Sequence, residues 1–200
     1  MEKIVLDAED VRRTLARMSH EIVERTEGRA LAVVGVHRRG AVLAQRLHTR
    51  LVELSGADIP LGDVDISFYR DDVGLRSGSR QPVVHASHVD FSLEDRTIVL
   101  VDDVLYTGRT VRAAIDALFD YGRPQRVQLA VLADRGHREL PIRPDYVGKN
   151  LPTARAERVN VRVEEIDGVD EVTIVEAAGE PGADGAPSPA ASQSDREARS

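Results

Sequence analysis

The chain has 200 residues, no cysteine, a net charge of −7 and 42% hydrophobic residues. This length and composition predict one globular domain with a sizeable core, and the lack of an 18-residue apolar run argues against a membrane-spanning helix or a membrane partner. Without cysteine there is no disulfide scaffold, thiolate zinc site or cysteine nucleophile, and the acidic balance argues against indiscriminate nucleic-acid binding while allowing a local basic face.

Hydrophobic periodicity predicts helices and strands that alternate along the chain. Helices are expected over 7–26, 41–54 and 108–121, and strands over 31–36, 64–69, 97–104 and 127–133, with short strands within 83–92. Residues 71–82 are expected to form a polar loop, prolines break up the region after 133, and strands 159–166 and 172–175 form a closing antiparallel pair. This order predicts an α/β fold with a mostly parallel sheet, whose ligands bind at the carboxyl ends of the strands.

The ends of the chain carry their own signals. The N-terminus is charged from Glu2 and Lys3 onward and has no signal-peptide core, which favours a cytoplasmic enzyme, although the absence of cysteine also fits an exported protein. Residues 177–200 are rich in Ala, Gly, Pro, Ser and acids and hold no large apolar side chain. Such a segment cannot offset its ordering entropy by burial, so we expect a folded domain over 1–176 and a disordered tail over 177–200.

Two carboxylates end the central strand, and a hydroxyl- and glycine-bearing turn follows them. Asp102 and Asp103 come after the apolar run 98–101, and Thr107-Gly108-Arg109-Thr110 precedes the next helix. Carboxylates can accept hydrogen bonds from a ribose diol, and the turn offers backbone N–H groups and a helix N-terminus to a phosphate. A strand that ends in Asp before a capped helix is common in α/β proteins, but the turn at this spacing favours a sugar-phosphate site. A Walker lysine motif and a G-x-G-x-x-G motif after a strand are both absent, which weakens a P-loop or dinucleotide enzyme.

Residues 98–110 resemble the phosphoribosyl-pyrophosphate (PRPP) signature of the type I phosphoribosyltransferases. The resemblance implies that Asp102 and Asp103 hold the ribose 2′ and 3′ hydroxyls and act in catalysis. It also implies that the 5′-phosphate is wrapped by Leu105, Tyr106, Thr107, Gly108, Arg109 and Thr110. The fold class that follows is the type I phosphoribosyltransferase fold, in which helices flank a mostly parallel central sheet, with a small hood and a flexible loop.

Two further loops resemble parts of the same site. The segment 34–40 looks like the pyrophosphate loop, which implies donor contacts for Arg38, Arg39 and Gly40. Many relatives carry a small polar residue where Arg38 stands, so Arg39 is the stronger candidate, and the resemblance implies a catalytic role for Arg39 in stabilising the leaving pyrophosphate. The segment 68–80 resembles the flexible catalytic loop and implies a catalytic role for Arg70, since such a loop brings cations to a leaving pyrophosphate.

The segment 134–153 resembles the base-binding hood of the bifunctional pyrimidine operon regulator/uracil phosphoribosyltransferase family. It implies base contacts for Asp134, Arg135 and Val147. Purine-specific relatives commonly carry Asp at the position of Tyr106, and a phenol is a poor base at neutral pH. The chain is therefore expected to favour uracil over hypoxanthine or guanine.

The resemblance also implies a surface for leader RNA of the pyrimidine operon. The candidate RNA contacts are Arg17, His20, Arg25, His137, Arg143 and Lys149. The alternative interpretation of these residues is an ordinary solvated face, because no RNA-recognition motif accompanies them. A homodimer or higher homo-oligomer would pool such faces.

The expected reaction converts uracil and PRPP into uridine monophosphate (UMP) and pyrophosphate, with Mg²⁺ carried by PRPP and no protein metal ligand assigned. Two functions stay open: an RNA-binding regulator that responds to uridine nucleotides and retains transferase activity, and a pyrimidine salvage transferase that does not bind RNA. A third, a regulator that has lost catalysis, is disfavoured by the presence of Asp102, Asp103 and 107–110.

Overall fold

A five-stranded parallel sheet forms the centre of the molecule in the computed structural model, which describes residues 2–26, 29–67, 69 and 87–176. The strand order is β3-β2-β4-β5-β6. The strands are β2 (Leu31–Val36), β3 (Leu61–Val64), β4 (Thr97–Leu105), β5 (Arg126–Asp134) and β6 (Tyr146–Asn150). Because all of them run in one direction, their carboxyl ends lie along a single edge of the sheet.

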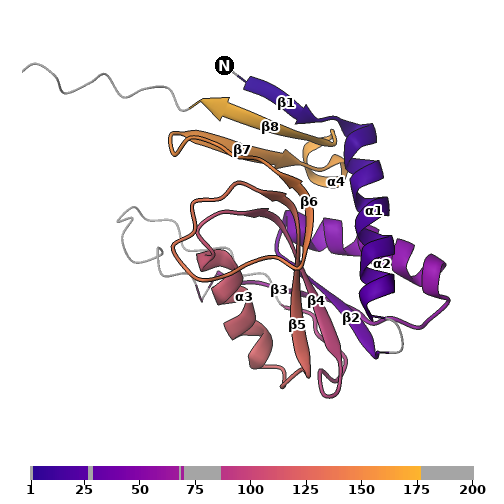
Figure 1. The fold of residues 1–200 in the computed structure, drawn as a ribbon. Helices are drawn as coiled ribbons and strands as arrows, with labels where there is room; N and C mark the ends of the chain where they lie inside the picture. Colours follow the sequence, from indigo (N-terminus) through magenta and orange to yellow (C-terminus); the bar gives the residue numbers. More distant parts are fainter. Residues whose placement is uncertain (1, 27–28, 68, 70–86, 177–200) are drawn as a thin grey trace, which may run out of the picture.

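Helices cover both faces of this sheet. Figure 1 shows α1 (Ala8–Thr26) and α2 (Arg39–Ser55) on one side and α3 (Arg109–Phe119) on the other. Apolar residues spaced three or four apart give each helix a buried stripe, as with the buried residues of α1. Helix α2 ends at Gly56, whose φ of 64° suits glycine and whose N–H bonds the Val52 carbonyl.

The central strands are buried on both faces, so their side chains alternate between two cores. In β4, Val99 and Val101 pack in the core beneath α1 and α2, whereas Ile98 and Leu100 pack beneath α3. The near-continuous apolar run from Ile98 to Val101 follows from this double burial. The same two-sided burial makes β4 a rigid support for the carboxylates at its end.

A second, smaller sheet lies above the first in Figure 1. It is antiparallel, with the order β1-β8-β7, and consists of β1 (Glu2–Leu6), β8 (Glu171–Glu176) and β7 (Glu157–Arg162). A one-turn helix, α4 (Glu164–Asp167), joins β7 to β8. The N-terminal strand thus pairs with the last strand of the described chain.

Three elements differ from the sequence expectation. The strand expected over 64–69 is instead β3, because Asp65 accepts hydrogen bonds from the Ser67 N–H and hydroxyl, and this turn ends the strand. The strand expected over 159–166 stops at Arg162, where Asp167 caps the turn by accepting from the Val163 N–H. Strand β6 lies in the region that was expected to be irregular.

The sequence pattern does not predict β6, because the strand is short and lies between Pro144 and Pro152. Gly148 within it has no apolar side chain to signal a strand, and its Cα lies so close to Leu132 and Thr14 that a Cβ could not fit. The expected loop at 71–82, residues 83–86 and the tail at 177–200 lie outside the described residues. In the described part of the segment 83–92, residues 87–92, the structure has an isolated antiparallel bridge between His88 and Asp63 in place of the expected short strands. None of the described helices is long and apolar enough to cross a membrane.

Candidate active site

A cavity of about 450 Å³ lies at the carboxyl ends of β2, β3 and β4. It brings together three segments that are distant in sequence: the loop after β2, the turn after β3 and the end of β4. Its lining residues are His37, Arg38, Arg39, Asp65, Ile66, Ser67, Asp102, Asp103, Val104 and Thr110. The pyrophosphate-loop and ribose candidates from the sequence therefore share one site.

Asp102 and Asp103 line this cavity with their carboxylates held by the backbone. Asp102 accepts from the Asp103 N–H at 2.9 Å, and Asp103 accepts from the Val104 N–H at 2.7 Å. Burial raises the pKa of Asp103, and the Val104 N–H and the charge of Arg39 partly oppose that rise. An acidic pair held in this way can accept hydrogen bonds from a vicinal diol and oppose a positive charge on the sugar.

Gly40, at the start of α2, packs directly on this pair. A Cβ built on Gly40 would lie 2.6 Å from the Val101 carbonyl oxygen and 3.2 Å from the Asp102 Cα. Glycine therefore allows the loop after β2 to approach β4 at the position where the carboxylates begin.

The turn between β4 and α3 has the geometry of an anion cradle. Gly108 has a φ of 93°, α3 begins at Arg109, and the Arg109 N–H donates to the Thr107 hydroxyl at 3.3 Å. The Thr107 carbonyl accepts from the N–H groups of Glu139 and Leu140, at 2.9 and 3.1 Å, which ties the turn to the hood. Backbone N–H groups at the start of a helix can receive a phosphate.

Arg39 is held by a carboxylate that the sequence analysis had not assigned to the site. Its guanidinium donates from Nε to Oδ2 of Asp167 at 3.0 Å and from Nη2 to Oδ1 at 2.7 Å. In the sequence, Asp167 lies in the link between the two closing strands, and no local pattern signals its proximity to Arg39. Arg38, by contrast, is exposed, and Arg70 lies outside the described residues.

The hood encloses a second cavity, of about 970 Å³, lined in part by Asp134, Arg135 and Val147. Arg138 forms a short ion pair with Asp134. Arg135 is 6% exposed, and its guanidinium lies 4.1 Å from the centre of the Tyr106 ring. Tyr106 therefore joins the turn between β4 and α3 to the hood through a cation–π contact.

The six RNA candidates do not form one uniform surface. Two of them link α1 to β6 or to the residue before it: Arg17 donates to the carbonyls of Val147 and Gly148 at 2.8 and 2.7 Å, and Arg25 donates to the Asp145 carbonyl at 3.1 Å. Two of the remaining four contact backbone carbonyls: Lys149 donates to the Val5 carbonyl, and His137 contacts the Thr153 carbonyl. Arg143 lines the hood cavity, and His20 lines a separate cavity together with Glu24.

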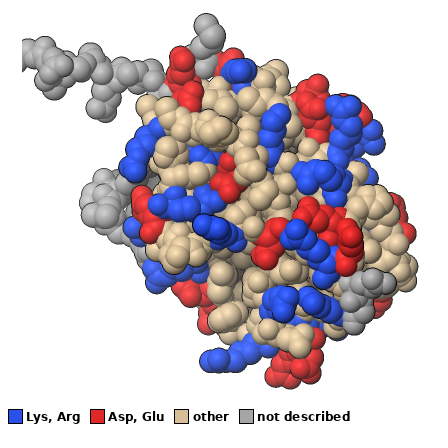
Figure 2. Space-filling model, viewed as in Figure 1, with Lys and Arg blue, Asp and Glu red and all other residues tan. Residues whose placement is uncertain are grey.

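Basic and acidic side chains are interspersed on the face that Figure 2 shows. Arg17 and Arg25 each form an ion pair with Glu21, and more than half of each arginine side chain remains exposed. A polyanion that approached α1 and β6 would therefore meet cations whose positions are already set by contacts with the backbone.

Comparison with known proteins agrees with this architecture. The model of the family described as "Phosphoribosyl transferase domain" matches residues 2–165. The "Bifunctional protein PyrR" of Roseiflexus sp. (strain RS-1) is 58% identical over 176 residues, which cover 87% of this chain and 95% of the relative. The protein of the same name from Deinococcus radiodurans is 57% identical over 171 residues, covering 85% and 92%.

Solved structures with the same fold are more distant in sequence. A hypoxanthine phosphoribosyltransferase of Trypanosoma cruzi has a TM-score of 0.65 at 18% identity and covers 87% of this chain and 96% of its own. A hypoxanthine phosphoribosyltransferase from Staphylococcus aureus has a TM-score of 0.63 at 19% identity, covering 85% and 90%. These likenesses concern the fold alone, and they confirm the expected fold class.

The parallel sheet, the acidic pair above it and the full-length relatives agree with one another, and the resemblance first seen in residues 98–110 and 134–153 is confirmed. The chain belongs to the phosphoribosyl transferase domain family and, within it, to the bifunctional PyrR proteins.

Proposed function

We propose that residues 1–176 act as one domain that transfers phosphoribose from PRPP to uracil, giving UMP and pyrophosphate, and that also binds pyrimidine-operon leader RNA in response to uridine nucleotides. The observation that carries the transferase proposal is the cavity shared by Asp102, Asp103 and residues 37–39, with the 105–110 turn beside it. The donor needs these three contacts for its ribose, pyrophosphate and 5′-phosphate.

The chemistry follows from where charge develops. When the anomeric C–O bond breaks, the ribose gains positive character and the pyrophosphate gains negative charge. Asp102 and Asp103 orient the ribose hydroxyls and oppose the positive charge, while Arg39, Arg38 and Arg70 offset the charge on the leaving group. A covalent nucleophile is not required.

Mg²⁺ is expected to enter with PRPP. The described residues contain no cluster of three or more His, Cys, Asp or Glu side chains that could hold a metal ion. The carboxylates of the cavity favour a cation near the donor, and Mg²⁺ commonly keeps water and substrate oxygens as ligands. When bound, it lowers the charge that the departing pyrophosphate must carry.

Uracil is the base that the hood favours. The Asp134 carboxylate is paired with Arg138, and Tyr106, whose ring lies under the Arg135 guanidinium, is a phenol and a poor base for a purine N7. Recognition would come from backbone groups near Val147. The test is product formation with uracil, orotate, hypoxanthine and guanine; turnover only with a purine would defeat the proposal.

The proposed regulatory activity depends on the basic side chains beside α1 and β6, which would bind the phosphates of leader RNA. The protein would act as a homodimer or higher homo-oligomer, which pools these basic faces, in the cytoplasm, where such transcripts occur. The alternative is a salvage transferase that does not bind RNA. Binding of a pyrimidine-operon leader should strengthen when UMP is added. If no binding occurs even at low salt, the salvage enzyme is the correct description.

A further inference from the structure

The hood loop, which comprises residues 135–142, is hydrogen-bonded to the turn between β4 and α3. The Arg135 N–H donates to the Leu105 carbonyl at 3.1 Å, and Nη1 of Arg138 donates to the Tyr106 carbonyl at 2.9 Å. The next carbonyl of the turn accepts two further N–H groups of the loop. Three successive carbonyls of the turn therefore accept hydrogen bonds from the hood loop.

The hood loop also packs on the glycine of the turn. A Cβ built on Gly108 would lie 3.3 Å from Ile142 Cδ1 and 3.4 Å from Leu140 Cβ. Glu139 adds an ion pair with Arg109 at 2.8 Å, but both side chains are more than half exposed, so this pair contributes little. The bonds to the carbonyls and the apolar contact are therefore the main links between the loop and the turn.

These links set the direction of a peptide group in the turn. The peptide bond between Thr107 and Gly108 is trans, so its carbonyl and its N–H point in opposite directions. The carbonyl points to the hood loop, and the Gly108 N–H points away from it. An anion bonded to that N–H would polarise the whole peptide group and make its carbonyl a stronger acceptor for the loop.

The hood loop holds a residue in an unfavourable backbone conformation. His137 has a φ of 59° and follows Gly136, whose φ is 76°. A residue with a side chain keeps such a φ only while the surrounding contacts impose it. Here those contacts are the bonds of Arg135 and Glu139 to the turn, on either side of His137, and the contact of the His137 ring with the Thr153 carbonyl. The turn therefore helps to fix the backbone that presents His137.

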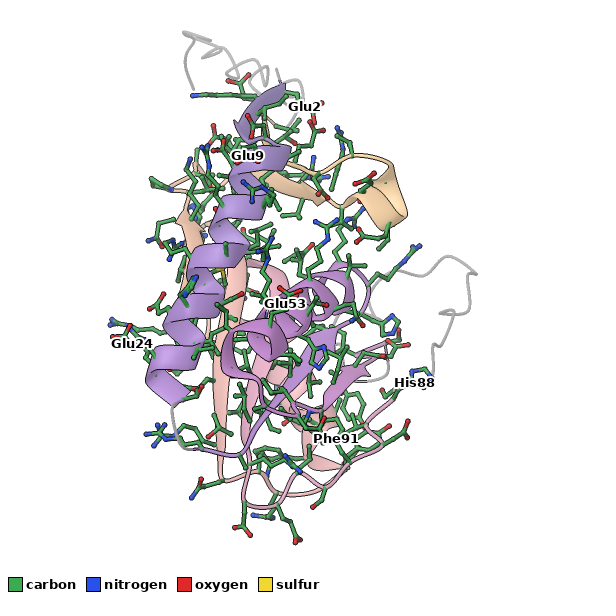
Figure 3. All side chains as sticks on the ribbon, turned by 90° about the vertical axis from the view of Figure 1, so that its right-hand side faces the viewer. Glu2, Glu9, Glu24, Glu53, His88 and Phe91 are labelled. Atoms are coloured by element: carbon green, nitrogen blue, oxygen red, sulfur yellow. The ribbon has the colours of Figure 1, made fainter. Side chains whose placement is uncertain are left out.

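The hood loop adjoins the residues that are proposed to bind RNA. His137 lies within the loop, and Arg143 follows it directly. Figure 3 shows α1 running along the face of the molecule, with Glu9 near its start and Glu24 near its end. Arg17 of this helix donates to two carbonyls of β6, and β6 pairs with β5, which leads into the hood loop. The loop thus lies between the turn and the proposed RNA surface.

We propose that the hood loop couples nucleotide binding to RNA binding. A 5′-phosphate bound at the 105–110 turn stabilises the loop conformation that presents His137 and Arg143, and RNA affinity rises as a result. This inference rests on the proposed function, and it names the phosphate of a 5′-phosphorylated ribose as the group that acts. Because coupling between two sites is reciprocal, bound RNA raises the affinity for the nucleotide by the same factor.

Hydrogen exchange of the full-length protein tests the first step without RNA. Saturating UMP should slow exchange at the amides of Glu139 and Leu140 by roughly fivefold or more. Ribose 5-phosphate, which has no base, should do the same when it saturates the site. The amides of β8, in the other sheet, are the internal reference. Slower exchange with UMP alone would show that the base acts rather than the phosphate, and would overturn the inference.

Two variants at one position separate the backbone bond from the side chain. Glu139→Pro removes the N–H that donates to the Thr107 carbonyl, whereas Glu139→Gln keeps it and removes only the charge. Leader-RNA binding is measured by filter binding without nucleotide and with UMP that saturates each variant. UMP should strengthen binding roughly five- to 20-fold in the wild type and in Glu139→Gln, and less than about twofold in Glu139→Pro.

Ile142→Ala supplies a second route should proline disturb the fold. It removes the side chain that packs on Gly108 and should reduce the effect of UMP. Leu151→Ala is the matched control, because Leu151 lines the same hood cavity but packs in the core beneath α1 and α2; it should keep the effect.

An unchanged effect of UMP in both Glu139→Pro and Ile142→Ala would overturn the inference, as would loop amides that exchange equally fast with UMP bound. Slower exchange with both phosphorylated ligands, but no binding of leader RNA under any condition, would instead refute the proposed regulatory function and leave the link between turn and loop in place.

Discussion

Asp167, in the one-turn helix of the small sheet, holds both donor nitrogens on one edge of the Arg39 guanidinium, at 3.0 and 2.7 Å. A bidentate pair fixes the plane of the guanidinium. The ion pair with Arg39 holds the pKa of the Asp167 carboxyl below its usual range, and the Val163 N–H assists. The C-terminal sheet thereby orients a loop whose role is proposed to be pyrophosphate binding.

Asp167→Asn should therefore impair donor binding more than turnover. We expect KM for PRPP to rise about three- to tenfold, because an amide keeps one hydrogen bond but loses the charge that holds Arg39 in place. Initial rates over a PRPP concentration series provide the measurement. Glu164→Gln, on the exposed side of the same turn, is the control; an unchanged KM in Asp167→Asn would remove Asp167 from donor binding.

Asp103→Asn should be more stable than the wild type and much less active. Burial raises the pKa of Asp103 in the folded state, so this carboxyl favours folding below its unfolded pKa and opposes it increasingly as pH rises through the folded value. At pH 7 the amide should increase the free energy of unfolding, and each ~1 kcal/mol of that increase should raise the melting temperature by about 2–4 °C. The kcat should fall by roughly 100-fold or more. Asp116→Asn, on the exposed face of α3, should change neither quantity; a destabilised Asp103→Asn would contradict the assignment.

Gly40→Ala should damage both fold and activity. The added Cβ meets the Val101 carbonyl at 2.6 Å, and relief requires a backbone shift beneath Asp102. We expect a loss of about 1–3 kcal/mol in the free energy of unfolding, measured in urea, with a marked fall in kcat. Gly56→Ala meets no atom within 4 Å and should cost about 1 kcal/mol through its φ of 64°, with activity retained.

Two arginines among the RNA candidates should behave differently on replacement. Arg143 is exposed in the hood, so Arg143→Ala should weaken leader-RNA binding without changing the melting temperature. The slope of log K for RNA binding against log salt concentration should become about 1 less steep. Arg17→Ala should weaken RNA binding and also lower the melting temperature, because Arg17 bonds two carbonyls of β6. Filter binding at several salt concentrations tests both; Arg123→Ala, an exposed arginine after α3, should have no effect on RNA.

The attachment of α4 to α2 should weaken in acid. The Arg46 guanidinium donates hydrogen bonds to both Glu165 and Asp170. The bond from Arg46 lowers the pKa of the Glu165 carboxyl. Burial alone would raise the pKa of Asp170, but the hydrogen bonds from Arg46 and the Glu164 N–H outweigh burial and lower it. A carboxyl whose pKa is lowered in the folded protein stabilises the fold at any pH above its unfolded-state pKa, which is about 4. This stabilisation is lost as the pH falls through the pKa of the folded state.

Urea unfolding of the wild type and Arg46→Met at pH 7 and pH 3 measures that contribution. The difference between them should be on the order of 1 kcal/mol at pH 7 and should shrink at pH 3. A difference that stays constant with pH would mean that Arg46 acts through packing rather than through its ion pairs.

Local pattern was sufficient for most of the large sheet and its helices. The expected helix at 7–26 corresponds to α1, and the apolar run before Asp102 corresponds to β4, because an amphipathic stripe or a doubly buried strand leaves a strong mark on the sequence. Strand β6 left no such mark: it lies at the edge of the sheet, contains Gly148, and forms only because β5 offers unpaired backbone groups.

The sequence by itself determined the family, the acidic pair, the candidate phosphate turn and the order of most helices and strands, since each depends on residues close together in the chain. Only the tertiary structure decided which distant side chains meet: Asp167 with Arg39, Asp63 with His37, and Arg135 with Tyr106. Such pairs depend on how the elements pack, and a charged side chain carries no local signal of the partner that packing will bring to it.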